Sequence, residues 1–197
     1  RFAADPSKVL FCAFNTSISR EIERKFKTQG MPEVVVKTIH ALGYQILREN
    51  SDFAARLQLH EHKYRTLFKS EGMQQKLRPF VKELLALHGL NPKESASRKV
   101  FARKNLLFRL ERRLLEINQK HRSILNGPKF TAFEELVRHY GIFTHPEEVS
   151  KTFRDELELY HAMSRILLKA GTEMAANSQV IDFTDMIWLP VRWHLHT

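Results

Sequence analysis

Cysteine is almost missing from this sequence, since Cys12 is the only one among 197 residues. One cysteine excludes an internal disulfide and a zinc site built on cysteine ligands. Cys12 lies in an apolar run, where cysteine usually serves as a small hydrophobic residue. This usage is typical of an intracellular protein, and we expect the chain to be cytoplasmic.

Long apolar runs are missing as well. No stretch approaches the ~20 apolar residues that a membrane helix requires, and the first residues do not follow the pattern of a signal peptide. The sequence therefore predicts neither a membrane protein nor a secreted one. The chain begins with Arg1 rather than Met, and we expect it to be a piece of a longer protein.

Acidic residues are outnumbered by basic ones. The 32 Lys and Arg residues against 22 Asp and Glu residues give a formal net charge of +10. A charge of this size favours a polyanionic partner, and nucleic acid is the first candidate. The hydrophobic content of 43% is sufficient for one fairly large core, or for one domain with part of a second.

The N-terminal part shows a strand–helix–strand pattern. Short apolar runs at 9–14 and 34–37 are typical of parallel strands that are buried on both faces. Between them, residues 17–28 carry apolar side chains at helical spacing, and Gly30 ends that pattern. We therefore expect a βαβ unit, followed by a second helix from Thr38. Two strands alone leave two open edges, so further strands should come from a longer parent chain.

After about residue 50 the strand signals disappear and helical periodicity dominates. Helices are expected around 77–85, over 97–124, around 133–139 and onward from a capping box at 144–147. Apolar positions cover well over half the circumference of the helix at 97–124, so we expect it to lie inside a bundle. The predicted fold is mostly α, with a helical bundle attached to a partial parallel α/β piece that has two short strands.

Polar side chains follow both predicted strands. Asn15 and Thr16 come after the first strand beside the ring of Phe14, and Thr38 and His40 come after the second. Adjacent parallel strands end at one edge of a sheet, and open α/β sheets bind ligands at that edge. Hydroxyl and amide groups there suit phosphates, and a free ring suits a stacked base. The alternative is that Phe14 belongs to the core and that the polar cluster only caps a helix.

Most of the excess positive charge lies in one predicted helix. Residues 98–122 contain nine basic side chains and two acidic ones. Helical spacing places five of the basic side chains in one sector opposite the apolar stripe, where they could follow a phosphate backbone. The alternative is an ordinary solvated helix face. The five residues are Arg98, Arg109, Arg112, Arg113 and Lys120.

Three segments carry a family resemblance. "VLFCAFNTSISREI" and the later "VKTIHALGYQIL" resemble motifs Ia and Ib of the UvrD/Rep-like superfamily 1A DNA helicases, and "VIDFTDMIWLP" resembles the element before the Walker B strand of these enzymes. The resemblance implies that residues 1–48 are part of RecA-like domain 1A, a P-loop NTPase fold. It likewise implies that 49–178 form helical subdomain 1B and that 179–197 lead towards Walker B.

The resemblance also implies roles for particular residues. In this family motifs Ia and Ib contact single-stranded DNA, which implies base stacking for Phe14 and phosphate or sugar contacts for Asn15, Thr16, Thr38 and His40. Many relatives carry a lysine beside the Asn or Thr of motif Ia, whereas this chain has only hydroxyl groups there, so the resemblance implies no ionic phosphate contact at that position. Structural support is implied for the last element, at Asp182, Phe183 and Asp185.

The nucleotide-binding motifs of such an enzyme do not occur in the sequence. Gly127-Pro128-Lys129 lacks the second glycine and the Ser or Thr of a Walker A loop, and no Asp-Glu pair follows an apolar strand. The resemblance implies that a parent ATP-dependent helicase binds ATP and Mg²⁺ through motifs outside this segment. Its implied partners are single-stranded DNA, a duplex junction and the second RecA-like domain. This chain alone should hold no cofactor and hydrolyse no ATP.

We expect no catalytic residue and no metal site within the chain. His60 with His62, and His194 with His196, have the spacing of metal ligands, but no cysteine or matched histidine pair completes a zinc site. An alternative function is a non-enzymatic basic helical module that binds nucleic acid or a protein partner. A Walker A loop encoded shortly upstream of Arg1 would distinguish the helicase from this alternative.

Overall fold

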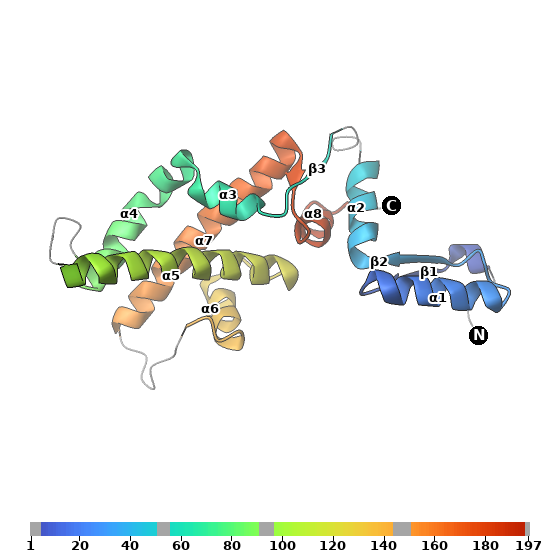
Figure 1. The fold of residues 1–197 in the computed structure, drawn as a ribbon, viewed down its shortest axis with the longest axis horizontal. Helices are drawn as coiled ribbons and strands as arrows, with labels where there is room; N and C mark the ends of the chain where they lie inside the picture. Colours follow the sequence, from blue (N-terminus) through green and yellow to red (C-terminus); the bar gives the residue numbers. More distant parts are fainter. Residues whose placement is uncertain (1–4, 51–55, 91–96, 144–150, 196–197) are drawn as a thin grey trace. The chain divides into compact units, whose positions relative to one another are not determined.

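The computed structural model shows a mostly α-helical protein with two small parallel sheets of two strands each (Figure 1). This agrees with the predicted fold class as far as the helical content and the first pair of strands are concerned. The sequence did not predict the second pair. The structure describes residues 5–50, 56–90, 97–143 and 151–195.

Two compact units make up the chain. The first consists of residues 1–57 and 183–197, and the second consists of residues 58–182. The sequence predicted boundaries after residues 48 and 178, whereas the units divide the chain nine and four residues later, after residues 57 and 182. Each unit is described by itself below.

The first unit contains the predicted βαβ pattern. The strands β1 and β2 pair in parallel, with Leu10 opposite Val35 and Ala13 opposite Thr38. The order of strand, helix and strand is therefore confirmed. The elements are a 3₁₀ turn (Pro6–Lys8), β1 (Leu10–Ala13), α1 (Thr16–Thr28), β2 (Val35–Thr38) and α2 (Ile39–Glu49).

The strands of this sheet are not buried on both faces, so that expectation was wrong. Leu10 is 46% exposed and Val35 is 40% exposed. Helix α1 packs on the strands, and the ring of Phe26 lies edge-on to Phe11 with 6.0 Å between ring centroids. A two-stranded sheet with one helix on it is too small to enclose its own strands, and full burial needs further layers.

Helix α8 (Asp185–Arg192) belongs to the first unit and packs against α2. The two helices approach so closely that a Cβ atom at Gly43 would lie 1.8 Å from the carbonyl oxygen of Met186. Leu47 of α2 and Leu189 of α8 have no exposed surface. This contact therefore requires glycine at position 43 and attaches the segment "DMIWLP" to α2.

The second unit is a helical bundle with a short sheet. Strand β3 (Gln58–Leu59) pairs in parallel with β4 (Val180–Ile181). The sequence did not predict these strands, because two residues are too few to show the alternation of apolar and polar side chains that indicates a strand. The helices are α3 (Lys63–Lys69), α4 (Glu71–Leu87), α5 (Ser97–Ser123), α6 (Phe130–His139) and α7 (Lys151–Ser178).

The predicted helices between residues 77 and 139 are confirmed as α4, α5 and α6. Gly89 and Gly141 follow α4 and α6 with φ of 64° and 59°, the left-handed conformation in which glycine commonly ends a helix. The capping box at 144–147 lies outside the described residues. The long helix predicted after it is present as α7.

Helix α7 makes the widest contacts in the bundle, since it packs against α3, α4, α5 and α6. Tyr160, Met163 and Leu167 lie at helical spacing along it and have no exposed surface. They belong to one apolar cluster with buried side chains of the other four helices. One face of α5 is thereby directed into this core.

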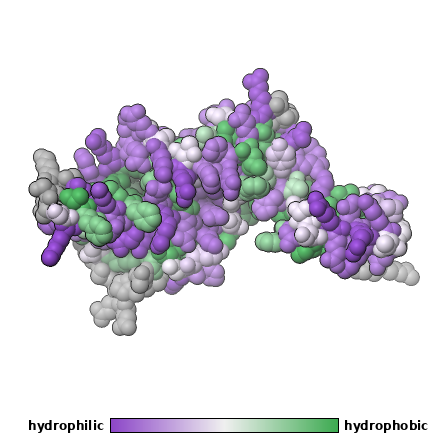
Figure 2. All heavy atoms as spheres, viewed as in Figure 1, coloured by the Kyte–Doolittle hydropathy of each residue, from purple (hydrophilic) through white to green (hydrophobic). Residues whose placement is uncertain are grey.

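The opposite face of α5 is exposed, so the expectation that this helix lies inside the bundle was wrong. Leu106, Leu110 and Leu114 are buried, whereas Phe101 is 67% exposed and Phe108 is 68% exposed. At 100° per residue both rings lie roughly opposite Leu110. Hydrophobic groups accordingly lie among hydrophilic ones over α5 in Figure 2. Counting apolar positions overestimated burial because it treats every apolar side chain as part of the core.

Candidate nucleic-acid interface

Phe14 lies at the edge of the first sheet where both strands end. Its neighbour Ala13 is buried and pairs with Thr38, the last residue of β2, while Phe14 itself is 80% exposed. Helix α1 begins two residues after Phe14, and α2 begins at Ile39. The ring is therefore not part of a core, and it stands beside the starting points of two helices.

Asn15 and Thr38 cap these two helices. The Asn15 side-chain oxygen accepts a hydrogen bond from the Ile18 amide at 2.8 Å, and the Thr38 hydroxyl oxygen accepts one from the Ala41 amide at 3.1 Å. Capping uses the oxygens as acceptors and leaves the Asn15 amide group and the Thr38 hydroxyl hydrogen as potential donors. The first turns of the helices add backbone N–H groups and partial positive charge, which favour an anion such as phosphate.

Thr16 and His40 lie in the first turns of α1 and α2, respectively. Thr16 is exposed, and His40 is half-buried. The His40 ring meets Phe183 edge-on, with ring centroids 6.3 Å apart, and Phe183 is 51% exposed. The structure thus places a second exposed ring beside a residue of the predicted interface, a contact that the sequence did not predict.

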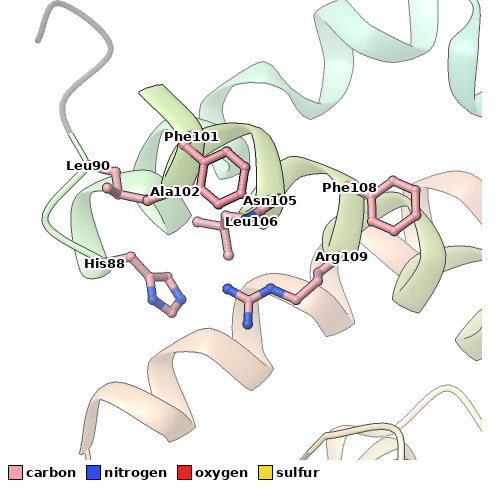
Figure 3. Close-up of a pocket in the computed structure, with 8 residues that line it drawn as sticks. All are labelled: His88, Leu90, Phe101, Ala102, Asn105, Leu106, Phe108 and Arg109. Atoms are coloured by element: carbon pink, nitrogen blue, oxygen red, sulfur yellow. The ribbon is translucent and has the colours of Figure 1, made fainter. Parts of the chain in front are cut away.

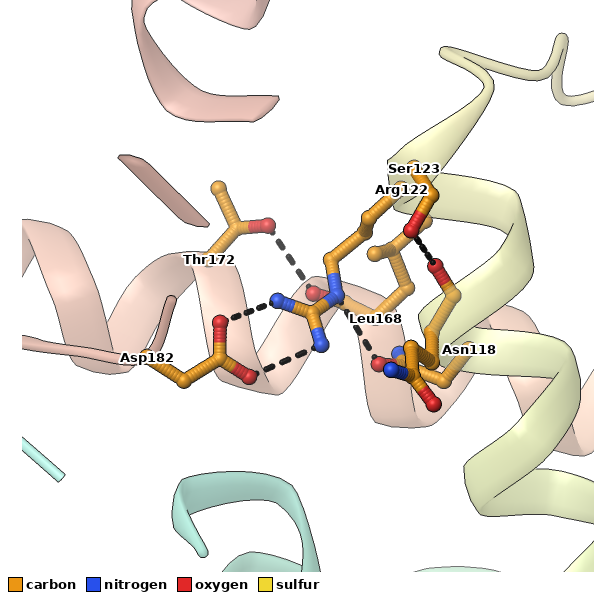
Figure 4. Close-up of polar contacts among 7 residues, drawn as sticks. Asn118, Arg122, Ser123, Leu168, Thr172 and Asp182 are labelled. Atoms are coloured by element: carbon orange, nitrogen blue, oxygen red, sulfur yellow. Dashed lines mark hydrogen bonds and ion pairs between the residues drawn. The ribbon is translucent and has the colours of Figure 1, made fainter. Parts of the chain in front are cut away.

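Asp182, Phe183 and Asp185, the three residues of the last motif, have different environments. Asp185 is fully buried at the start of α8 in the first unit. Asp182 is buried in the second unit, where its two oxygens accept hydrogen bonds from the Arg122 guanidinium at 2.6 and 2.9 Å (Figure 4). Asn118 also accepts a bond from Arg122 at 3.0 Å. The aspartates therefore make internal contacts, and only Phe183 presents its side chain to solvent.

Three of the five predicted basic contacts are exposed on α5. Arg98, Arg109 and Arg112 are exposed and form no ion pair within the described residues. Lys120 is half-buried, with its ammonium 4.4 Å from the centroid of the Tyr140 ring. The exposed face thus offers three free guanidinium groups from the predicted stripe.

Arg113 does not lie opposite the buried face, so its predicted position was wrong. Its side chain is 13% exposed, pairs with Glu156 at 3.3 Å and lies over the Phe143 ring at 4.4 Å. At 100° per residue Arg113 borders the buried face of α5. The attraction of Glu156 on α7 and the adjacent ring draw the guanidinium inward, where it is not available to a phosphate.

No group of three or more His, Cys, Asp or Glu side chains is arranged to hold a metal ion among the residues that the structure describes. His196 lies outside the described residues. Within them, no helix combines the length and apolar character needed to cross a membrane.

Comparisons with protein-family models, with curated proteins and with solved structures found no match to this chain. The likeness to motifs Ia and Ib consequently rests on the residues quoted above.

Proposed function

We propose that this chain is a DNA-binding part of an ATP-dependent UvrD/Rep-like helicase. In this proposal residues 1–48 belong to a RecA-like domain, and the helical unit corresponds to its inserted subdomain. Single-stranded DNA binds at the strand-end edge, defined here as Phe14, Asn15, Thr16, Thr38 and His40. The parent enzyme translocates on one strand and unwinds the duplex at a junction.

The exposure of Phe14 is the observation that carries the proposal. An 80% exposed phenylalanine costs solvation free energy unless a ligand covers it. A ring beside two helix N-termini suits a nucleotide, whose base stacks on the ring while its phosphate meets N–H groups. The net charge of +10 adds a general attraction for a polyanion.

The residues of this chain do not fit ATP and Mg²⁺. It has neither a phosphate-binding Gly-Lys loop nor the Asp-Glu pair of Walker B. We therefore assign no step of ATP hydrolysis to these residues. In the proposal, nucleotide chemistry comes from other parts of the parent protein.

Fluorescence anisotropy of a labelled single-stranded oligonucleotide tests the proposal. Stacking on an aromatic side chain contributes ~1–3 kcal/mol per base, so Phe14→Ala should weaken binding by about 5- to 150-fold. Phe14→Tyr keeps a ring and should retain affinity. Leu10→Ala is the control, because it removes an exposed apolar side chain from the first residue of β1, away from the strand-end edge. Equal affinities for Phe14→Ala and the wild type would refute binding at the strand-end edge and favour the non-enzymatic basic module.

A further inference from the structure

We infer that the outer face of α5 is a separate binding surface for single-stranded nucleic acid. In this inference Phe101 and Phe108 stack on bases, and Arg109 and Arg112 contact phosphates. It deepens the proposed nucleic-acid binding but uses a different unit of the chain and different observations. Neither ring belongs to the motifs that suggested the helicase family.

The spacing of the two rings suits one strand. Phe101 and Phe108 are seven residues apart on a helix, so both face the same side, about 10.5 Å apart along the axis. That distance is about three times the 3.4 Å axial rise per phosphate of one strand in B-form DNA. With 67% and 68% of their surfaces exposed, both rings have a free face for a base.

The charges around the rings favour a polyanion over an apolar protein partner. Lys104 and Arg109 are exposed, and at 100° per residue they lie on opposite sides of the ring pair. Arg112 lies one helical turn beyond Phe108 and is exposed as well. Alternating rings and cations are the arrangement with which proteins hold single strands without sequence preference. A purely apolar partner would have to desolvate these cations.

A pocket of about 530 Å³ lies beside Phe101. Figure 3 shows the side chains of His88 and Arg109 pointing toward one another across it. Asn105 adds a neutral polar group to its lining. The carboxylate of Glu156 lies 3.4 Å from the His88 ring and pairs with the Arg113 guanidinium at 3.3 Å. The pocket has the size to receive one nucleotide, with the Arg109 guanidinium as a cation for its phosphate.

The test uses the full chain and a labelled 20-nucleotide oligothymidylate in anisotropy titrations. Removal of both rings in the variant Phe101→Ala/Phe108→Ala should weaken binding at least about 5-fold, given ~1–3 kcal/mol per stacked base. Leu107→Ala is the matched control, because Leu107 is 38% exposed on the same helix but about 100° away from Phe108. An oligonucleotide with abasic sites should bind the wild type and the ring variant with similar affinity, since it has no bases to stack.

Charge reversal supplies a second readout. The logarithm of the binding constant falls as the logarithm of the salt concentration rises. The variant Arg109→Glu/Arg112→Glu should make this negative slope shallower by about 1.4, since each phosphate contact on a single strand contributes about 0.7. Lys76→Glu/Lys82→Glu reverses two exposed charges on α4 instead and should leave that slope much closer to the wild-type value.

The outcomes separate this inference from the strand-end edge. If the ring variant loses affinity and Phe14→Ala does not, α5 binds the strand and the proposed edge fails. If only Phe14→Ala loses affinity, the α5 inference is overturned. It is also overturned if the ring variant changes the sedimentation of the chain at unchanged DNA affinity, because the face would then be a self-association surface. A wild type that binds no single strand at low salt overturns both.

Discussion

The contact between Arg122 and Asp182 joins helix α5 to the residue that follows β4. The side chain of Arg122 is 3% exposed and that of Asp182 is 10% exposed, and two hydrogen bonds connect them. The guanidinium also lies 4.0 Å from the centroid of the Tyr64 ring on α3. A buried pair of this kind makes each partner costly to remove singly, because the remaining charge has no counterpart.

We predict that Asp182→Asn lowers the free energy of unfolding by about 3–5 kcal/mol. The measurement is urea denaturation followed by circular dichroism. Lys69→Met is the control. The Lys69 side chain is 61% exposed and pairs with Glu111 at 3.6 Å, so water solvates this ion pair. Its loss should lower the free energy of unfolding by at most about 1 kcal/mol. A loss below about 1 kcal/mol for Asp182→Asn would show that the buried pair does not stabilise this unit.

At the scale of the elements, two histidines lie where α5, α6 and α7 meet. Burial, together with the nearby His161 and Arg122, lowers the pKa of His121 on α5 to about 4. The pKa of His161 on α7 is also lowered, chiefly by burial. Its ring packs against Phe133 of α6, with 5.1 Å between ring centroids. Burial therefore favours the neutral form of both imidazoles over the charged form.

Acidification should accordingly destabilise this junction. An ordinary histidine has a pKa of 6.5, so as the pH falls below 6.5 the unfolded chain takes up the His121 proton before the folded chain does. The free energy of unfolding should decrease between pH 6.5 and about 4, by about 1–3 kcal/mol for this group. Urea midpoints at several pH values measure it. His121→Asn should remove much of this loss of stability at low pH. His139 is exposed, so His139→Asn is the control and should keep the loss. Equal pH profiles for the two variants would contradict the role given to His121.

At the scale of the whole molecule, the chain combines two units with different composition of secondary structure. The first has a parallel two-stranded sheet with three helices, and the second has a bundle of five helices with a short sheet, within the residues described. Neither unit supplies a Walker motif, since none occurs in the sequence. Any DNA binding by the chain should therefore be uncoupled from nucleotide turnover.

The purified chain should release no phosphate from ATP above background, with or without single-stranded DNA. Phosphate transfer requires a phosphate-binding loop and carboxylates that hold Mg²⁺, and the sequence lacks both motifs. A phosphate-release assay measures this, with a helicase that has an intact Walker A loop as the positive control. DNA-stimulated turnover that persists after rigorous purification would contradict the prediction.

The sequence by itself determined the order and approximate bounds of most elements, because helical periodicity and helix-ending residues are local. The parallel βαβ pattern and the ends of α4 and α6 at Gly89 and Gly141 are of this kind. The close contact of α2 with α8 through Gly43 was not predictable, since it depends on a segment far along the chain. The strands β3 and β4 were too short to show a pattern.

Only the tertiary structure decided which side chains are available to a ligand. The sequence left Phe14 either in the core or at an interface, and it assigned Phe101 and Phe108 to the core, whereas all three are exposed. It placed Arg113 in the basic stripe, but Glu156 on α7, far along the chain, pairs with that guanidinium at 3.3 Å and draws it toward the buried face. Burial and ion pairing depend on which distant segments pack together. Local periodicity does not show which segments these are.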